Sequence, residues 1–149
     1  MQPKVRAIII DDDASCRTLL EVLLKQRGYE VISLSDPTVC PLYANSECPC
    51  PQDQACGDFL LTDNQMPHMT GIEFVERQLQ RGCKGIVGNK AVLSGTWSDE
   101  DLAHAERLGC QVFDKPYNFK KIMAWLDERE KQILPGRNLV VFDSDHFDH

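Results

Sequence analysis

The chain has 149 residues, of which 42% are hydrophobic and 26% are charged, a balance typical of one soluble globular domain. Its 16 basic residues are outnumbered by 23 acidic ones, and the resulting net charge of −7 disfavours direct DNA binding. No apolar run approaches the roughly 20 residues of a membrane span, and the first residues lack the features of a secretory signal. We therefore expect a cytoplasmic protein without a membrane segment.

Strand and helix patterns alternate along the chain. Residues 5–10 are a nearly continuous β-branched run, as in a strand covered on both faces, and residues 14–27 repeat apolar side chains at helical spacing before Gly28. Further strands are predicted at 29–34, 59–62, 91–93 and 111–113, and further helices at 72–79, 98–108 and 119–134. This alternation predicts a parallel sheet with right-handed crossovers and with functional groups beyond the carboxyl ends of its strands.

Two stretches interrupt the alternation. Residues 36–57 contain closely spaced prolines, which lack the N–H donor that a helix needs, so we expect a shortened or irregular second helix there. Residues 135–149 combine a short apolar patch with an acidic end. We expect one domain over residues 4–134, with an insertion at 36–57, followed by a tail that is too short to be an output domain.

Polar side chains stand at the ends of four predicted strands: Asp11 with Asp12, Asp63, Ser94 and Lys115. Neighbouring carboxylates repel one another unless a cation neutralises them, and Mg²⁺ prefers oxygen ligands of this kind. A carboxylate beside such an ion can attack a phosphoryl donor, while a lysine and a hydroxyl meet the charge on the transferred group. The sequence therefore predicts a phosphoryl-transfer site at one edge of the sheet.

The segments that contain these residues resemble the receiver domains of two-component response regulators. The matching pieces are Ile8–Asp13, Leu60–Gly71, Val92–Gly95 and Asp114–Pro116, in the order and spacing of that family. The resemblance implies a flavodoxin-like, doubly wound α/β fold, in which a five-stranded parallel sheet of order 2-1-3-4-5 has helices on both faces.

The resemblance also implies how the acidic residues divide their roles. Asp63 would be the phosphoacceptor. Asp11 and Asp12 would organise Mg²⁺, or Mn²⁺ in its place, together with Asp63 and the backbone carbonyl of Gln65.

The remaining residues of the implied site would surround the phosphoryl group. Ser94 would hydrogen-bond it and move toward it, and Lys115 would pair with one of its oxygens. Gly95 would leave space for the donor. Gln65 and Thr96 would flank the path of the hydrolytic water.

One position departs from the family pattern. Receivers commonly carry a tyrosine or phenylalanine three residues before the lysine, whose ring swings inward when the hydroxyl residue shifts, but this chain has Val112 there. Trp97 either takes part in such a motion or is an ordinary half-exposed tryptophan at the start of a helix. Asp13 is expected to cap the first helix rather than to join the site.

The 7 cysteines form two groups. Cys40, Cys48, Cys50 and Cys56 lie in the proline-rich stretch, where four thiolates can bind Zn²⁺ or an iron–sulfur cluster. The spacing lacks a C-x-x-C pair, which argues against a metal site. Two other interpretations of this segment therefore stay open: redox-active or disulfide-forming thiols, and an irregular loop with free thiols. The other three, Cys16, Cys83 and Cys110, are expected to pack as apolar residues.

We expect a phosphorylation-activated switch that stands alone as a single domain. It would accept its phosphoryl group from a sensor histidine kinase or a phosphotransfer protein, would catalyse only its own phosphorylation and dephosphorylation, and would signal to a separate protein. A phosphorylation-dependent homodimer is a further expected state.

Two alternatives to this switch remain open. One is a metal- or redox-sensing module that uses the cysteine segment, with phosphorylation vestigial. The other is a haloacid-dehalogenase-like phosphatase, which Gln65 disfavours because such enzymes usually place a second aspartate at that position.

Overall fold

The computed structural model describes residues 5–35, 54–55, 57–66, 69–80, 87–115, 118–133 and 138–139. Most of the proline-rich connection, its four cysteines, Cys83 and nearly all of the tail lie outside these residues, so the predictions made for them stay predictions.

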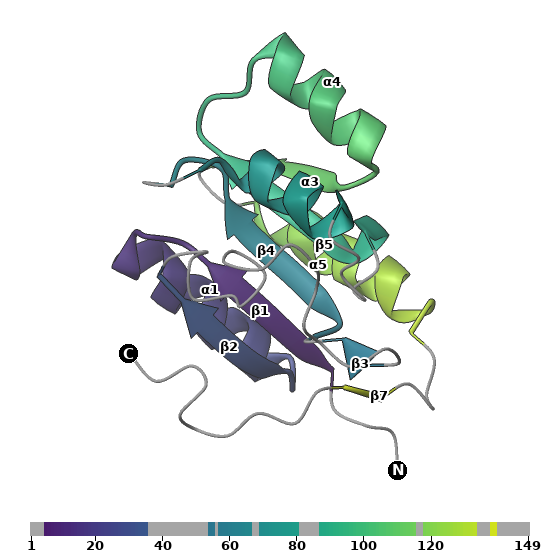
Figure 1. Cartoon of the computed structure of the whole chain (residues 1–149). Helices are drawn as coiled ribbons and strands as arrows, with labels where there is room; N and C mark the ends of the chain where they lie inside the picture. The colour runs from purple at the N-terminus through teal and green to yellow at the C-terminus, as the bar shows by residue number, and fades with distance from the viewer. Residues whose placement is uncertain are drawn as a thin grey trace.

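Five parallel strands form the central sheet (Figure 1). Their bounds are β1 Arg6–Ile10, β2 Glu30–Leu34, β4 Phe59–Asp63, β5 Lys90–Ser94 and β6 Gln111–Asp114. The sheet order is β2-β1-β4-β5-β6, and every pair of neighbours is parallel. Since the short strand β3 lies outside this sheet, the order is the predicted 2-1-3-4-5, and the flavodoxin-like topology is confirmed.

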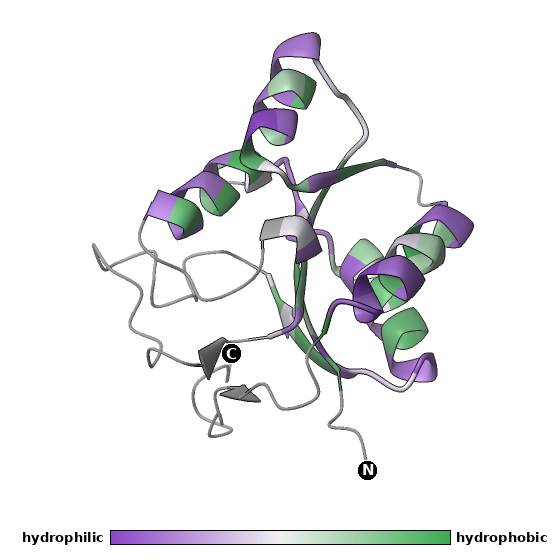
Figure 2. Cartoon of the chain, turned by 90° about the vertical axis from the view of Figure 1, so that its right-hand side faces the viewer, coloured by the Kyte–Doolittle hydropathy of each residue, from purple (hydrophilic) through white to green (hydrophobic). Residues whose placement is uncertain are grey.

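Among the described residues, four helices cover the two faces of this sheet (Figure 1). Their bounds are α1 Ala14–Gln26, α3 Gly71–Gln80, α4 Asp99–Leu108 and α5 Phe119–Glu130, and a 3₁₀ turn, Val87–Asn89, precedes β5. Figure 2 shows largely hydrophobic strands between helices that each carry both hydrophobic and hydrophilic residues, as amphipathic helices do. The last helix is shorter than the predicted 119–134, because residues 131–133 form a turn whose N–H groups at Gln132 and Ile133 donate to carbonyls three residues back.

Local capping residues set the ends of α1 and α4. The Asp13 side chain accepts from the backbone N–H groups of Ser15 and Cys16, which confirms its predicted capping role, and these hydrogen bonds lower the pKa of the Asp13 carboxyl. Gly28 follows α1 with a φ of 97°, a left-handed conformation that glycine adopts without strain. Ser98 caps α4 by accepting from the N–H of Asp101, three residues on.

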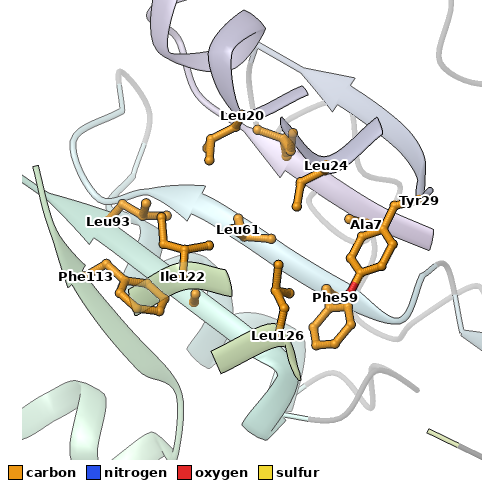
Figure 3. Packing of buried hydrophobic residues seen from close by; sticks show 12 residues of the cluster. Ala7, Leu20, Leu24, Tyr29, Phe59, Leu61, Leu93, Phe113, Ile122 and Leu126 are labelled. Carbon is orange, nitrogen blue, oxygen red and sulfur yellow. The ribbon is translucent and has the colours of Figure 1, made fainter. Parts of the chain in front are cut away.

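Two clusters of buried apolar side chains fill the spaces on either side of the sheet. The cluster on the α1 and α5 side, shown in Figure 3, consists of Ala7, Ile9, Leu20, Leu24, Tyr29, Phe59, Leu61, Ala91, Leu93, Phe113, Ile122 and Leu126. The cluster on the α3 and α4 side consists of Ile10, Leu34, Leu60, Met69, Ile72, Phe74, Val75, Val92 and Ala105. Burying a side chain of leucine or phenylalanine size stabilises the folded state by about 1.5–3 kcal/mol, so the two clusters stabilise the packing of the helices against the strands.

A second, two-stranded sheet was not predicted. Strand β3, Gln54–Ala55, pairs in parallel with β7, Asn138–Leu139, and so joins the segment before β4 to the segment after α5. Within the described part of the chain, none of the helices combines the length and apolar character needed to span a membrane.

Candidate functional site

Three carboxylates meet at the carboxyl edge of the sheet. Asp11 directly follows β1 and Asp63 ends β4, and these two strands are neighbours. Together with Asp12 they form a group in which each residue offers a carboxylate oxygen within 4.8 Å of the others. Asp11 and Asp63 are buried, with 1% and 6% of their surface exposed, whereas Asp12 is exposed to solvent.

Lys115 bridges the two buried carboxylates. Its Nζ lies 3.3 Å from Oδ2 of Asp11 and 3.2 Å from Oδ1 of Asp63. Its backbone N–H donates to the carbonyl of Ser94 at 2.9 Å, which ties the residue after β6 to the end of β5. The second oxygen of Asp11, Oδ1, accepts from the N–H of Asp13 at 2.9 Å.

Burial and charge act together on the titration of this group. Burial raises the pKa of the Asp63 carboxyl, the Asp11 carboxylate raises it further, and the opposing effect of Lys115 is smaller. For Lys115, burial lowers the pKa of the ammonium, but the attraction of Asp11 and Asp63 outweighs it, so the pKa lies above its ordinary value. The group thus combines three carboxylates with the Lys115 ammonium, which contacts two of them, and a divalent cation would compensate the excess negative charge.

The donor set fits such a cation. Carboxylate oxygens from three residues are the hard ligands that Mg²⁺ prefers, and the exposed position of Asp12 leaves one side open for water or phosphate oxygens. Gln65, whose carbonyl is the predicted fourth protein ligand, has its N–H 3.3 Å from Oδ1 of Asp63.

The loop after β4 holds Asp63 by a close backbone contact. Asn64 is buried, and its backbone and side-chain oxygens accept from the N–H groups of Gly71 and Ile72 at 3.0 and 3.2 Å. A Cβ at position 71 would lie 2.5 Å from the Asp63 carbonyl oxygen. Only glycine allows α3 to begin this close to the backbone of Asp63.

Ser94 is buried at the end of β5, and its hydroxyl is engaged in the loop that follows. Oγ donates to the Thr96 carbonyl and accepts from the Thr96 N–H, each at 3.1 Å. The Thr96 hydroxyl in turn accepts from Nε2 of Gln65 at 3.0 Å, so the two residues expected to flank the water path touch each other. Gly95 is exposed, and within the part of the chain that the structure describes, a Cβ there would meet nothing closer than the Lys115 Cβ at 4.0 Å.

Trp97 makes a contact that the sequence analysis did not foresee. Its indole Nε1 donates to the carbonyl of Phe113 in β6 at 3.1 Å, and its ring is half-buried against the cluster on the α3 and α4 side. The sequence does show a large aromatic side chain three residues after Ser94, but it does not identify a backbone carbonyl as the partner of that side chain. Val112 is half-buried in that same cluster.

Cys16 and Cys110 are half-buried free thiols. Cys110 packs against the cluster on the α3 and α4 side, its Sγ lies 3.7 Å from the Ala105 carbonyl, and burial raises the pKa of its thiol. This packing agrees with the prediction for Cys110.

The fold and the site together define a doubly wound α/β protein with an acidic pocket and a lysine at the carboxyl edge of its sheet. The chain belongs to the response regulator receiver domain family, whose model matches residues 7–127. Receiver domains of this family accept phosphoryl groups in two-component signalling and bind Mg²⁺ at an acidic pocket of this kind.

Known proteins agree with this assignment. The chain is 28% identical over 128 residues to the CAI-1 autoinducer sensor kinase/phosphatase CqsS of Vibrio cholerae, a match that covers 81% of this chain and 17% of that protein. A signal receiver domain of an HD domain-containing protein from Pseudomonas fluorescens superposes with a TM-score of 0.70 at 18% identity, covering 89% of this chain and 90% of the other.

Chemotaxis protein CheY4 of V. cholerae superposes with a TM-score of 0.65 at 24% identity, covering 85% of this chain and 98% of the other. These structural likenesses concern the fold. The chain spans no more than 20% of the length of the curated relatives it matches, so their activities as whole proteins do not transfer to it.

Proposed function

We propose that this chain is a signalling switch that accepts a phosphoryl group on Asp63 and reports its state to a separate protein. The donor would be a sensor histidine kinase or a phosphotransfer protein. The observation that supports the proposal best is the pairing of the Lys115 ammonium with both Asp11 and Asp63 at 3.3 and 3.2 Å, inside a group of three carboxylates.

Each residue at this edge has a distinct part in the proposed transfer. An oxygen of the Asp63 carboxylate attacks phosphorus, and the bond from phosphorus to the donor breaks as the donor leaves with its electron pair. Lys115 stays beside the newly formed acyl phosphate and pairs with one of its oxygens. The Ser94 hydroxyl donates to another oxygen, and the exposed Gly95 leaves room for the incoming donor.

Asp11 and Asp12 would hold Mg²⁺ together with Asp63 and the Gln65 carbonyl, and Mn²⁺ would fit the same oxygen ligands. The bound ion would neutralise charge on the phosphoryl oxygens. Without a cation, the repulsion between Asp63 and Asp11 resists the approach of a further anionic group.

Hydrolysis of the acyl phosphate returns Asp63 to its starting state. Water would reach phosphorus past Gln65 and Thr96, whose side chains touch at 3.0 Å. Phosphorylation and its reversal would be the only reactions that the chain catalyses.

Intact-mass spectrometry tests the proposal. Purified protein is incubated with acetyl phosphate and Mg²⁺, and we expect the gain of one phosphoryl group, because the site itself supplies the chemistry. Asp63→Asn should gain none. Asp13→Asn is the matched control, since this neighbouring aspartate is exposed and caps α1, and it should label like the parent. Equal labelling of the parent and of Asp63→Asn would contradict the proposed acceptor.

A phosphotransfer screen then identifies the biological donor. Candidate histidine kinases from the same genome are first phosphorylated and then mixed with the parent or with Asp63→Asn. Transfer to the parent alone would identify a partner kinase, whereas transfer to both proteins would place the acceptor elsewhere in the chain.

A further inference from the structure

We propose that Trp97 transmits the phosphorylation state of Asp63 to the face of the molecule formed by α4 and β6. The inference rests on the proposed function, because it concerns what happens when the Ser94 hydroxyl turns toward a phosphoryl group. It assigns a positioning role to a residue outside the reacting groups.

The hydroxyl of Ser94 has one proton, and the structure shows where it goes. Oγ donates to the carbonyl of Thr96 at 3.1 Å and accepts from the N–H of the same residue at 3.1 Å. To donate to a phosphoryl oxygen on Asp63, the hydroxyl must turn this proton away from Thr96. The Thr96 carbonyl then loses that donor, and the loop at 95–97 loses a hydrogen bond to the end of β5.

The other side of this loop is held by Trp97. Its indole N–H donates to the Phe113 carbonyl at 3.1 Å, across a separation of 16 residues. Two residues further along, the backbone N–H of Lys115 donates to the carbonyl of Ser94 at 2.9 Å. The contacts therefore run in a closed path from the Ser94 hydroxyl through Trp97 to β6 and back to Ser94, so a change at the hydroxyl acts on the indole.

The indole is also positioned to change the outer surface. Trp97 packs against the cluster on the α3 and α4 side together with Leu108 at the end of α4 and Val112 in β6. Because close-packed interiors do not deform continuously, a displaced indole disturbs the packing of this cluster, against which Leu108 and Val112 also pack. The relative position of α4 and β6 would thus depend on the state of Asp63.

Nuclear magnetic resonance of the two indole N–H groups tests this inference. The chain contains 2 tryptophans, so a ¹⁵N-labelled sample gives two indole signals, which Trp97→Phe and Trp125→Phe assign. After addition of acetyl phosphate and Mg²⁺, we expect the Trp97 signal to shift and its N–H to exchange faster with water. The Trp125 ring packs against Phe59 and Phe113 in the other cluster, and its signal serves as the internal control.

Two variants show whether the change runs through the hydroxyl. Asp63→Asn with the same donor should leave the Trp97 signal unchanged. Ser94→Ala without any phosphoryl donor should already show the faster indole exchange, because its loop lacks both the hydrogen bond that Oγ donates to the Thr96 carbonyl and the one that Oγ accepts from the Thr96 N–H. Trp97→Phe keeps an aromatic ring but has no indole N–H, and it should still gain a phosphoryl group.

Parallel mass spectra keep the two hypotheses apart. A phosphorylated sample whose Trp97 signal and exchange rate equal those of the unphosphorylated protein would overturn the inference and leave the proposed function intact. Parent-like exchange in Ser94→Ala would overturn it too. A sample that gains no phosphoryl group would overturn the proposed function, and the inference with it.

Discussion

Replacing Gly71 by alanine should destabilise the fold at the point where α3 meets Asp63. The new Cβ would lie 2.5 Å from the Asp63 carbonyl oxygen and 3.1 Å from the side chains of Thr62 and Val92. Ordinary contacts are about 3.5–4.0 Å, so α3 and β4 must separate by about 1 Å. Forcing extra atoms into a packed region costs about 1–3 kcal/mol, and the lower entropy of the unfolded alanine chain returns about 0.4–1 kcal/mol.

We therefore expect Gly71→Ala to lose about 1–2 kcal/mol of unfolding free energy, measured by urea denaturation at an unchanged m value. The corresponding fall in melting temperature is about 2–4 °C for each kcal/mol in a chain of this size. Gly95→Ala is the matched control, because the Lys115 Cβ, at 4.0 Å, is the only described atom that its Cβ would meet within 4 Å, and it should unfold like the parent. If Gly71→Ala proves as stable as Gly95→Ala, the close approach at Asp63 is not a constraint.

Three further predictions concern the metal, a buried hydroxyl and a helix cap. In EDTA, Asp63→Asn should unfold at a higher temperature than the parent, because burial and Asp11 disfavour the Asp63 carboxylate of the parent. Mg²⁺ should raise the melting temperature of Asp63→Asn less than that of the parent. Tyr29→Phe keeps the ring but loses the hydroxyl that donates to Glu130, and it should cost about 1–2 kcal/mol in urea denaturation near neutral pH. Ser98→Ala should lower the stability by about 1 kcal/mol in the same assay, because α4 loses its cap.

The cost of Tyr29→Phe should also depend on pH. Burial and the hydrogen bond to Glu130 raise the pKa of the Tyr29 hydroxyl. The hydroxyl therefore contributes fully to the free energy of unfolding below about pH 10, the ordinary pKa of tyrosine. This contribution is lost as the pH rises through the raised pKa. The parent and the variant should therefore converge in alkaline solution. A stability difference between the parent and Tyr29→Phe that does not change with pH would refute this reasoning. The metal prediction would be refuted if Mg²⁺ raised the melting temperatures of Asp63→Asn and the parent equally. The cap prediction would be refuted if Ser98→Ala were as stable as the parent.

The strands and the acidic edge could be predicted because their signals are local, whereas the strand order followed from the resemblance to receiver domains. An apolar run that ends in a carboxylate identifies both the strand and the end at which Asp11 and Asp63 lie. Helix caps are equally local, as Asp13 and Ser98 show. Once the alternation fixes a parallel sheet, the carboxyl ends of neighbouring strands must meet, and the grouping of these carboxylates follows.

The contacts between loops could not be predicted, because they depend on tertiary proximity. Gln65 and Thr96 are 31 residues apart and meet through side chains that the sequence leaves free to point elsewhere. Lysine side chains are mostly exposed in proteins, yet Lys90 is only 4% exposed and donates to the side chain of Gln78 at 2.8 Å. The short strands β3 and β7 have two residues each, too few for any periodic pattern.

The pairing of β3 with β7 matters for anyone who shortens this chain. A fragment cut after the last helix would keep Gln54–Ala55 but remove Asn138–Leu139, the only strand that pairs with it among the described residues. The backbone groups of Gln54–Ala55 that pair with this strand would then lose their partners. Expression fragments should therefore extend through residue 139, so that the segment before β4 stays joined to the segment after α5.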